Sequence, residues 1–244
     1  MYPETYPMNV RMWAVCLPLL ALSITSLDHR QGSSTTPLDR LSEPWWRARH
    51  ERAVRMTQFG RADVAFLGDS ITQGWEGVGE QVWLRDIAPL KAANFGFGGD
   101  RTEHVLWRLE NGELIGMHPK VVVLLIGTNN VGKGQSPGQT ADGVRAIVRE
   151  LRIRLPQTKV LLLAIFPRGL TSDDPLREKV RAATEQFHTC ADGHWVRFVD
   201  IGSIYLHPDG SMRTGMMPDV LHPNEAGYEV WAKAIVPEIQ ACLK

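Results

Sequence analysis

The sequence predicts one α/β domain whose parallel β-sheet is covered by helices on both faces. Five short apolar segments, each typical of a buried strand, alternate with longer segments of helical periodicity. Strands that are apolar throughout favour a parallel sheet with both faces covered. The chain of 244 residues is long enough for one such domain with a substantial core. The predicted strands are residues 63–67, 91–95, 120–126, 159–166 and 196–199.

Each predicted helix has a recognisable beginning. Ser42-Glu43-Pro44 opens the first, with proline in its first turn, and this helix ends near Gly60. Asp100 with Glu103 three residues later has the spacing of a capping box, and this helix stops at Asn111-Gly112. The remaining predicted helices are residues 137–155, 174–190 and 224–244.

The N-terminal region differs from the rest of the chain. Arg11 precedes an apolar run over residues 12–22, and small polar residues follow, which is typical of a secretory signal. The run is short and interrupted by Pro18, so we expect no stable membrane insertion. We assign residues 1–27 to a signal peptide, 28–41 to a mobile linker and 42–244 to the folded domain. An interfacial anchor or a first helix is the alternative for the apolar run.

The expected location is therefore secreted or periplasmic. In such an oxidising compartment Cys190 and Cys242 could pair, and the sequence does not settle their distance.

Composition argues against several classes of function. The formal net charge is +0 and no basic stretch is long, so nucleic acid is not expected as a partner. The three cysteines form no metal-like cluster. Gly96-x-Gly98 begins like a dinucleotide-binding motif, but Arg101 stands where the last glycine is needed. We expect neither a metal nor a cofactor.

Several polar residues follow the predicted strands and together favour nucleophilic catalysis by serine. Ser70 lies at the carboxyl end of the strand over residues 63–67, where open α/β sheets place their ligand crevice. Asp219 and His222 are three residues apart in a loop, so the carboxylate can contact one imidazole nitrogen while the other faces Ser70. Taken singly, Ser70 and the Asp-x-x-His pair could instead be helix caps.

Donors for a developing oxyanion are also suggested. Gly99 follows the second strand and can present its backbone N–H, and Asn129 follows the third and can donate from its amide. Ser136 stands in a competing G-x-S-x-G pattern, but the following Pro137 has no N–H to donate. We interpret Ser136 as a helix cap.

The motifs resemble a known family. Gly68-Asp69-Ser70, Gly99, Asn129 and Asp219-Val220-Leu221-His222 match the four motif blocks of the GDSL esterases, or SGNH hydrolases. The resemblance implies a three-layer flavodoxin-like fold with a five-stranded parallel sheet and a metal-free serine hydrolase. It implies Ser70 as nucleophile, His222 as base, Asp219 as its orienter, and Gly99, Asn129 and the Ser70 N–H as oxyanion hole. Longer stretches, residues 94–100, 104–114, 127–130 and 167–169, are similar to the catalytic subunits of platelet-activating factor acetylhydrolase.

Two features depart from that subfamily: the expected signal peptide and the extra tryptophans Trp45, Trp46 and Trp75. We therefore expect a secreted serine esterase that removes small acyl groups, acetyl first, from an O-acylated substrate such as an acetylated carbohydrate. The alternatives are an acetylhydrolase of platelet-activating-factor-like phospholipids and a non-catalytic glycan-binding protein. A homodimer is left open.

Three residues are expected to bind substrate: Ile71, Trp75 and Leu221. Ile71 follows the predicted nucleophile and Leu221 precedes the predicted base, so both can crowd the acyl group. Ile71 and Leu221 could instead point into the core.

Overall fold

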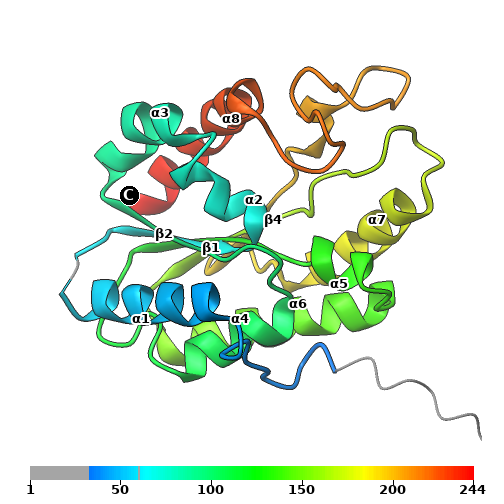
Figure 1. Cartoon of the computed structure of the whole chain (residues 1–244). Helices are drawn as coiled ribbons and strands as arrows, with labels where there is room; N and C mark the ends of the chain where they lie inside the picture. Colours follow the sequence, from blue (N-terminus) through cyan, green and yellow to red (C-terminus); the bar gives the residue numbers. More distant parts are fainter. Residues whose placement is uncertain (1–32, 60) are drawn as a thin grey trace, which may run out of the picture. The chain divides into compact units, whose positions relative to one another are not determined.

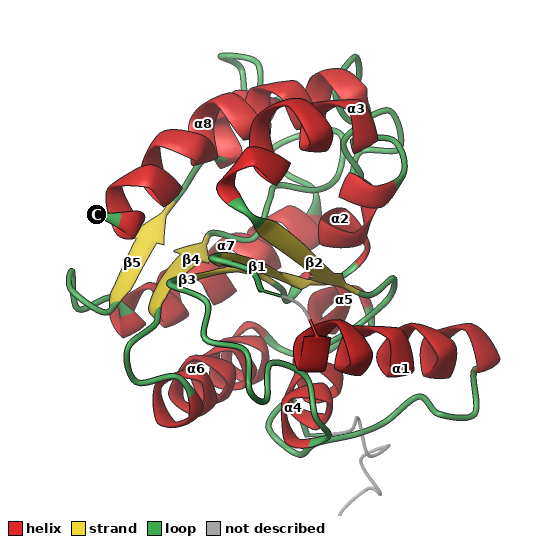
Figure 2. Cartoon of the chain, turned by 90° about the vertical axis from the view of Figure 1, so that its left-hand side faces the viewer, coloured by secondary structure: helices red, strands yellow, loops and turns green. Residues whose placement is uncertain are grey.

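The computed structural model describes residues 33–59 and 61–244, and it contains a five-stranded parallel sheet between two layers of helices (Figures 1 and 2). The predicted α/β class and the three-layer architecture are confirmed. The predicted signal peptide lies outside the described residues. The strands are β1 (Val64–Gly68), β2 (Ala92–Gly96), β3 (Val121–Leu125), β4 (Lys159–Leu163) and β5 (Val196–Val199).

The strands lie in the order β2-β1-β3-β4-β5 and all pairs are parallel. Every residue of β1 and β3 is buried, as their apolar runs predict for central strands covered on both faces. This order is the flavodoxin-like one, whose topological switch point lies between β1 and β3. The loops that follow these two strands lie at the carboxyl edge of the sheet, where open α/β folds bind their ligands.

Two apolar clusters hold the helices on the sheet. On one face pack the helices α1 (Pro44–Phe59), α4 (Thr102–Glu110), α6 (Pro137–Arg154) and α7 (Pro175–Phe187), with core residues such as Trp46, Val105 and Ile147 (Figure 1). The other face carries α8 (Glu225–Leu243), whose Trp231 and Ile235 belong to the same apolar cluster as Phe66 and Val123 of the sheet. Among the described residues, no helix has both the length and the apolar character needed to cross a membrane.

Between β1 and β2 the chain forms a series of short helical pieces that the periodicity of the sequence does not predict. They are α2 (Ser70–Gln73), η1 (Gly74–Glu76), α3 (Glu80–Val82), the π-helical turn η2 (Trp83–Ile87) and η3 (Ala88–Leu90). Each piece is too short for a repeating apolar face, so only tertiary packing stabilises it. The same holds for α5 (Thr128–Gly132), which follows β3.

Residues 33–41 contain no helix or strand, but this part of the expected linker is attached to the domain. Ser34 is buried, and its carbonyl accepts a hydrogen bond from Thr102 Oγ1 at 2.8 Å. The N–H of Leu38 donates to the Glu103 carbonyl at 3.1 Å, and Arg40 binds Asp100 at 2.8 Å. The expectation of a mobile linker is therefore wrong for these residues. Their side-chain and backbone hydrogen bonds fix the segment.

The cysteines whose pairing the sequence left open are both free thiols. Cys190 is half-buried near the end of α7, and Cys242 is buried in α8.

Two glycines allow α2 to lie against the ends of the strands. A Cβ at Gly96 would stand 2.2 Å from the Gln73 nitrogen and 2.6 Å from the Thr72 carbonyl carbon. A Cβ at Gly68 would stand 2.4 Å from the Leu125 carbonyl oxygen. Because these neighbours are backbone atoms, they cannot give way locally. The glycines thus set the distance between α2, which begins with Ser70, and the sheet.

We expect Gly96→Ala to lower the free energy of unfolding by about 3 kcal/mol or more, because the new methyl group collides with backbone. Gly215→Ala is the matched control, since no atom lies within 4 Å of its Cβ. Urea unfolding of both variants measures the difference. Equal stability of the two variants would contradict the close approach.

Candidate active site

Ser70 is held at the first residue of α2, directly after β1. Asp69 caps this helix, with Oδ1 accepting from the Ile71 N–H at 3.0 Å. The Tyr228 hydroxyl of α8 donates to the Ile71 carbonyl at 2.7 Å. Hydrogen bonds thus hold both the N–H and the carbonyl of Ile71. The Ser70 side chain remains partly exposed at the carboxyl edge of the sheet.

His222 joins Ser70 to Asp219. Its Nε2 lies 2.9 Å from Ser70 Oγ, and its Nδ1 lies 2.6 Å from Asp219 Oδ2. The other carboxylate oxygen, Oδ1, accepts from the backbone N–H groups of Leu221 at 3.1 Å and His222 at 2.7 Å. Partial burial acts to raise the pKa of Asp219, but the hydrogen bonds from the His222 side chain and backbone outweigh it and lower that pKa. Asp219 therefore stays ionised beside the imidazole.

The loop between Asp219 and His222 contains an unusual backbone conformation. Val220 has φ of 56°, in the left-handed region. For a β-branched residue this is a true outlier, which costs about 1–3 kcal/mol and persists only where surrounding contacts enforce it. The turn that results folds the N–H groups of residues 221 and 222 back onto Asp219.

The structure shows the surroundings of each of the three hydrogen-bond donors that were expected to bind an oxyanion. Ser70 is the first residue of its helix, where an N–H has no intrahelical acceptor. Gly99 has φ of 74°, a conformation that favours glycine. Among the described residues, none accepts a hydrogen bond from the N–H of Ser70 or of Gly99. Asn129 uses one amide hydrogen to bind the Asp100 carbonyl at 3.0 Å, which orients its side chain.

A buried ionic network holds these donors, and sequence reasoning missed it. The Asp100 carboxylate accepts from Arg40 and from Trp46 Nε1 at 2.8 Å each, and from Arg108 Nε at 2.9 Å. Arg108 is fully buried and also binds Glu113. Asp100 was expected to cap α4, but the N-cap is Arg101. That expectation is wrong because two guanidinium groups and an indole take up the carboxylate instead.

The three residues expected to bind substrate lie in different environments. Trp75 is fully buried and packs against Tyr228 and Trp231, with ring centroids 4.5 and 4.8 Å apart. The expectation of a substrate contact is wrong for Trp75, because the turn η1 directs its indole into the core below α8. Ile71 is also buried in that cluster. Leu221 is half-buried beside His222 and packs in neither core cluster.

Ser136 lies away from these groups and is a helix cap, as predicted. Its Oγ accepts from the Gln139 N–H at 3.1 Å at the start of α6. Within the described part of the chain, no group of three or more His, Cys, Asp or Glu side chains could hold a metal ion.

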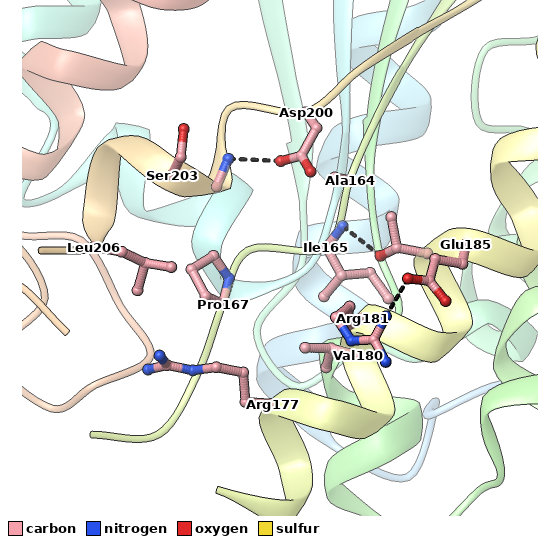
Figure 3. A pocket seen from close by; sticks show the side chains of 12 residues that line it. Ala164, Ile165, Pro167, Arg177, Val180, Arg181, Glu185, Asp200, Ser203 and Leu206 are labelled. Atoms are coloured by element: carbon pink, nitrogen blue, oxygen red, sulfur yellow. Dashed lines mark hydrogen bonds and ion pairs between the residues drawn. The ribbon is translucent and has the colours of Figure 1, made fainter. Parts of the chain in front are cut away.

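A separate cavity of about 340 Å³ lies beside the ends of β4 and β5, next to α7 (Figure 3). Its walls are mainly aliphatic, with Ile165, Pro167, Val180 and Leu206, and Arg177 and Asp200 lie at its edges. The cavity is not lined by Ser70, Asp219 or His222. This cavity is therefore distinct from the site formed by Ser70, His222 and Asp219.

The hydrogen-bonded residues Ser70, His222 and Asp219 have the geometry that acyl transfer to serine requires. A hydroxyl is hydrogen-bonded to an imidazole nitrogen, and the other nitrogen is bound to an ionised carboxylate. The N–H groups of Ser70 and Gly99 have no acceptor among the described residues, so they are available as hydrogen-bond donors.

Comparisons with known proteins agree with this chemistry. Residues 66–230 match the sequence model of the GDSL-like lipase/acylhydrolase family. The alpha1 subunit of platelet-activating factor acetylhydrolase IB from Bos taurus is 38% identical over 210 residues, which cover 85% of this chain and 88% of the relative. The alpha2 subunit from Rattus norvegicus is 38% identical over 184 residues, covering 75% and 78%.

Two solved structures share the fold. A GDSL-like lipase from Bacteroides thetaiotaomicron superimposes with a TM-score of 0.66 at 18% identity, covering 79% of this chain and 97% of that one. An acetylxylan esterase from Geobacillus stearothermophilus has a TM-score of 0.58 at 20% identity, covering 74% and 94%. With the extensive match to curated relatives, the conclusion is that this chain belongs to the GDSL-like lipase/acylhydrolase family and is a carboxylic ester hydrolase.

Proposed function

We propose that this chain removes small acyl groups, acetyl first, from an O-acylated substrate, with Ser70, His222 and Asp219 as a catalytic triad. The observation that carries the proposal is the hydrogen bond of 2.9 Å between Ser70 Oγ and His222 Nε2, continued at 2.6 Å from Nδ1 to Asp219. Family membership sets aside the alternative of a non-catalytic glycan-binding protein.

In the proposed reaction His222 Nε2 takes the Ser70 proton as Oγ bonds to the carbonyl carbon. The N–H groups of Ser70 and Gly99 and the Asn129 amide stabilise the resulting oxyanion. The bond to the alcohol oxygen then breaks, and His222 returns the proton to that oxygen. Water repeats the sequence on the acyl-enzyme, which releases the acid and restores Ser70. Asp219 keeps the Nδ1 proton in place and stabilises the imidazolium.

Two classes of acetyl ester are candidates for the substrate. Similarity to subunits of platelet-activating factor acetylhydrolase over most of the chain favours an acetylated phospholipid. Acetylated carbohydrate is the other candidate, since the fold is shared with an acetylxylan esterase. Mass spectrometry of products from acetyl-phospholipid, acetylated xylan and acetylated monosaccharides, offered side by side, distinguishes the two.

We also propose that the enzyme is exported, because Arg11, the apolar run and the polar residues after it are typical of a secretory signal. N-terminal sequencing of protein recovered outside the cytoplasm tests this proposal.

Asp69 gives the site a pH-dependent element next to the proposed nucleophile. It is almost fully buried, and its Oδ2 has no hydrogen-bond partner among the described residues. Burial raises the pKa of Asp69 to about 7, although the Ile71 N–H and the Arg168 guanidinium act to lower it. The folded protein therefore binds a proton at Asp69 over a pH range in which the unfolded chain has lost it.

We expect Ser70→Ala and His222→Ala each to lower kcat by about 10⁴-fold or more while the fold survives, because triad members act as a unit. Asn129→Ala should raise the barrier by about 2.7–4 kcal/mol, the effect of one oxyanion donor. Hydrolysis of p-nitrophenyl acetate measures both effects. Ser136→Ala is the matched control, which should lose about 1 kcal/mol of stability with its cap and keep its activity. An inactive Ser136→Ala together with an active Ser70→Ala would refute the assignment.

We expect Asp69→Asn to change how stability depends on pH. In the wild type, a raised pKa makes stability fall as the pH rises from about 4 to about 7, since the folded state binds more protons there. Asparagine keeps the Oδ1 acceptor and cannot ionise, so the variant should gain up to about 4 kcal/mol relative to wild type across that range. Urea unfolding at about pH 4.5 and about pH 8, near the two ends of the titration, measures the gain. An unchanged difference between the proteins would show that Asp69 does not titrate in this range.

We expect kcat/KM to fall steeply from acetyl to butyryl to octanoyl p-nitrophenyl esters if Leu221 borders the acyl group, because overpacking an apolar site costs about 1–3 kcal/mol. Leu221→Ala should then move the optimum toward longer chains. Leu84→Ala, an exposed leucine, is the control and should keep the wild-type profile. A wild-type preference for octanoate would contradict the small-acyl proposal.

A further inference from the structure

The strained residue Val220 is tied to a neighbouring loop outside the triad. Its N–H donates to the Met217 carbonyl at 3.0 Å, and its own carbonyl accepts from the Gly169 N–H, also at 3.0 Å. The second contact fixes the direction of the peptide group that follows Val220. Because that group leads into the N–H donors bound by Asp219, the Gly169 contact is suited to maintaining the left-handed turn.

Gly169 is placed by close packing on the start of α7. It has φ of 81°, and a Cβ there would stand 2.3 Å from Asp174 Cγ. Asp174 in turn caps α7, with Oδ1 accepting from the Leu176 N–H at 2.8 Å. The loop after β4 therefore lies directly against the first turn of this helix.

Arg177, in that first turn, uses its guanidinium to hold the loop. Nε donates to the Arg168 carbonyl at 2.9 Å, Nη2 donates to the Gly169 carbonyl, and Nη1 donates to the Gly210 carbonyl. The residue is buried, and the charge of the nearby Asp174 carboxylate acts on it. All its hydrogen bonds go to backbone carbonyls of the two loops that flank the Asp219–His222 segment.

Arg181 offers a natural contrast one turn further along α7. Both arginines line the cavity of Figure 3, but Arg181 is exposed and pairs with Glu178 and Glu185 of its own helix. Both arginines therefore place a positive charge in the cavity wall, but it is Arg177 that forms the hydrogen bonds to the loops.

We propose that Arg177 is a positioning residue for the triad: by holding residues 168–169 it keeps the Gly169 N–H on the Val220 carbonyl, and thereby keeps Asp219 against His222. Arg177 acts from outside the site and touches no reacting group. The inference rests on the proposed triad.

The test compares Arg177→Met, Arg177→Lys and the control Arg181→Met in the full chain. Arg177→Met should lower kcat on p-nitrophenyl acetate by about 10²-fold with KM nearly unchanged, the effect of a misplacement of about 1 Å. Arg177→Lys should recover part of the loss, because an ammonium can donate to some of the same carbonyls. Arg181→Met should match the wild type.

Two further readouts separate positioning from general stability. An imidazole that has lost its carboxylate is less basic, so the acid limb of the kcat/KM profile should move to lower pH in Arg177→Met. The downfield proton NMR signal of the His222 Nδ1–H, which needs no turnover, should weaken or move upfield. Wild-type pH dependence and an unchanged NMR signal in a folded Arg177→Met would overturn the proposal.

Val220→Gly provides a second route should Arg177→Met fail to fold. Glycine adopts the left-handed conformation at residue 220 without strain, so Val220→Gly alone should keep the wild-type pH profile and the wild-type His222 signal. In that background Arg177→Lys should add less than its single effect, because both changes act on one element. Full additivity in the double variant would overturn the proposal. Failure of the triad itself is distinct, because Ser70→Ala would then remain active.

Discussion

The hydrogen bond between Ser70 Oγ and His222 Nε2 joins parts of the chain that are 152 residues apart. Its length depends on two independent supports. On one side, the glycines at the ends of β1 and β2 let α2 lie directly on the strands. On the other, Tyr228 of α8 binds the backbone of that turn, so the helix that follows His222 is locked to the helix that begins with Ser70. The distance is therefore set by the packing of backbone and of a buried aromatic cluster.

The fold and the proposed oxyanion hole depend on the same buried charges. Asp100, Arg108 and Glu113 are inside the protein, where removal of one partner leaves an uncompensated charge. Arg108 also lies close to the carbonyls of Gly68 and Phe95, each at 3.3 Å, at the ends of β1 and β2. The network thus connects the strand ends to the loop that presents Gly99 and to the carbonyl that orients Asn129. A site built this way gains preorganised donors at the expense of tolerance to mutation around it.

Most of the fold could be predicted from the sequence because its strands are continuous apolar runs and its long helices have periodic faces. The position of Ser70 followed from chain order, since the carboxyl ends of parallel strands meet at one edge. Asp219 and His222 lie in a loop and were identified by their spacing and by the resemblance to the GDSL esterases. The short helices after Ser70 could not be predicted, because they have no period of their own. Trp75 shows the same limit: its proximity to Ser70 in sequence gave no information on the direction of its side chain. The partners of Asp100 were missed because Arg40 and Arg108 are distant in sequence and charge alone does not show which carboxylate they bind.

The contacts of Arg40 also show that residues before the first helix belong to the folded domain. This residue lies in the segment first assigned to a linker, yet it binds the carboxylate of Asp100, the carbonyl of Gly98 at 2.8 Å and Glu43. A recombinant chain begun at residue 42 would keep every strand and every long helix and would still leave Asp100 with one guanidinium in place of two. For expression, truncation and domain fusion, the segment from Ser34 to Arg40 therefore belongs with the folded domain, upstream of its first helix.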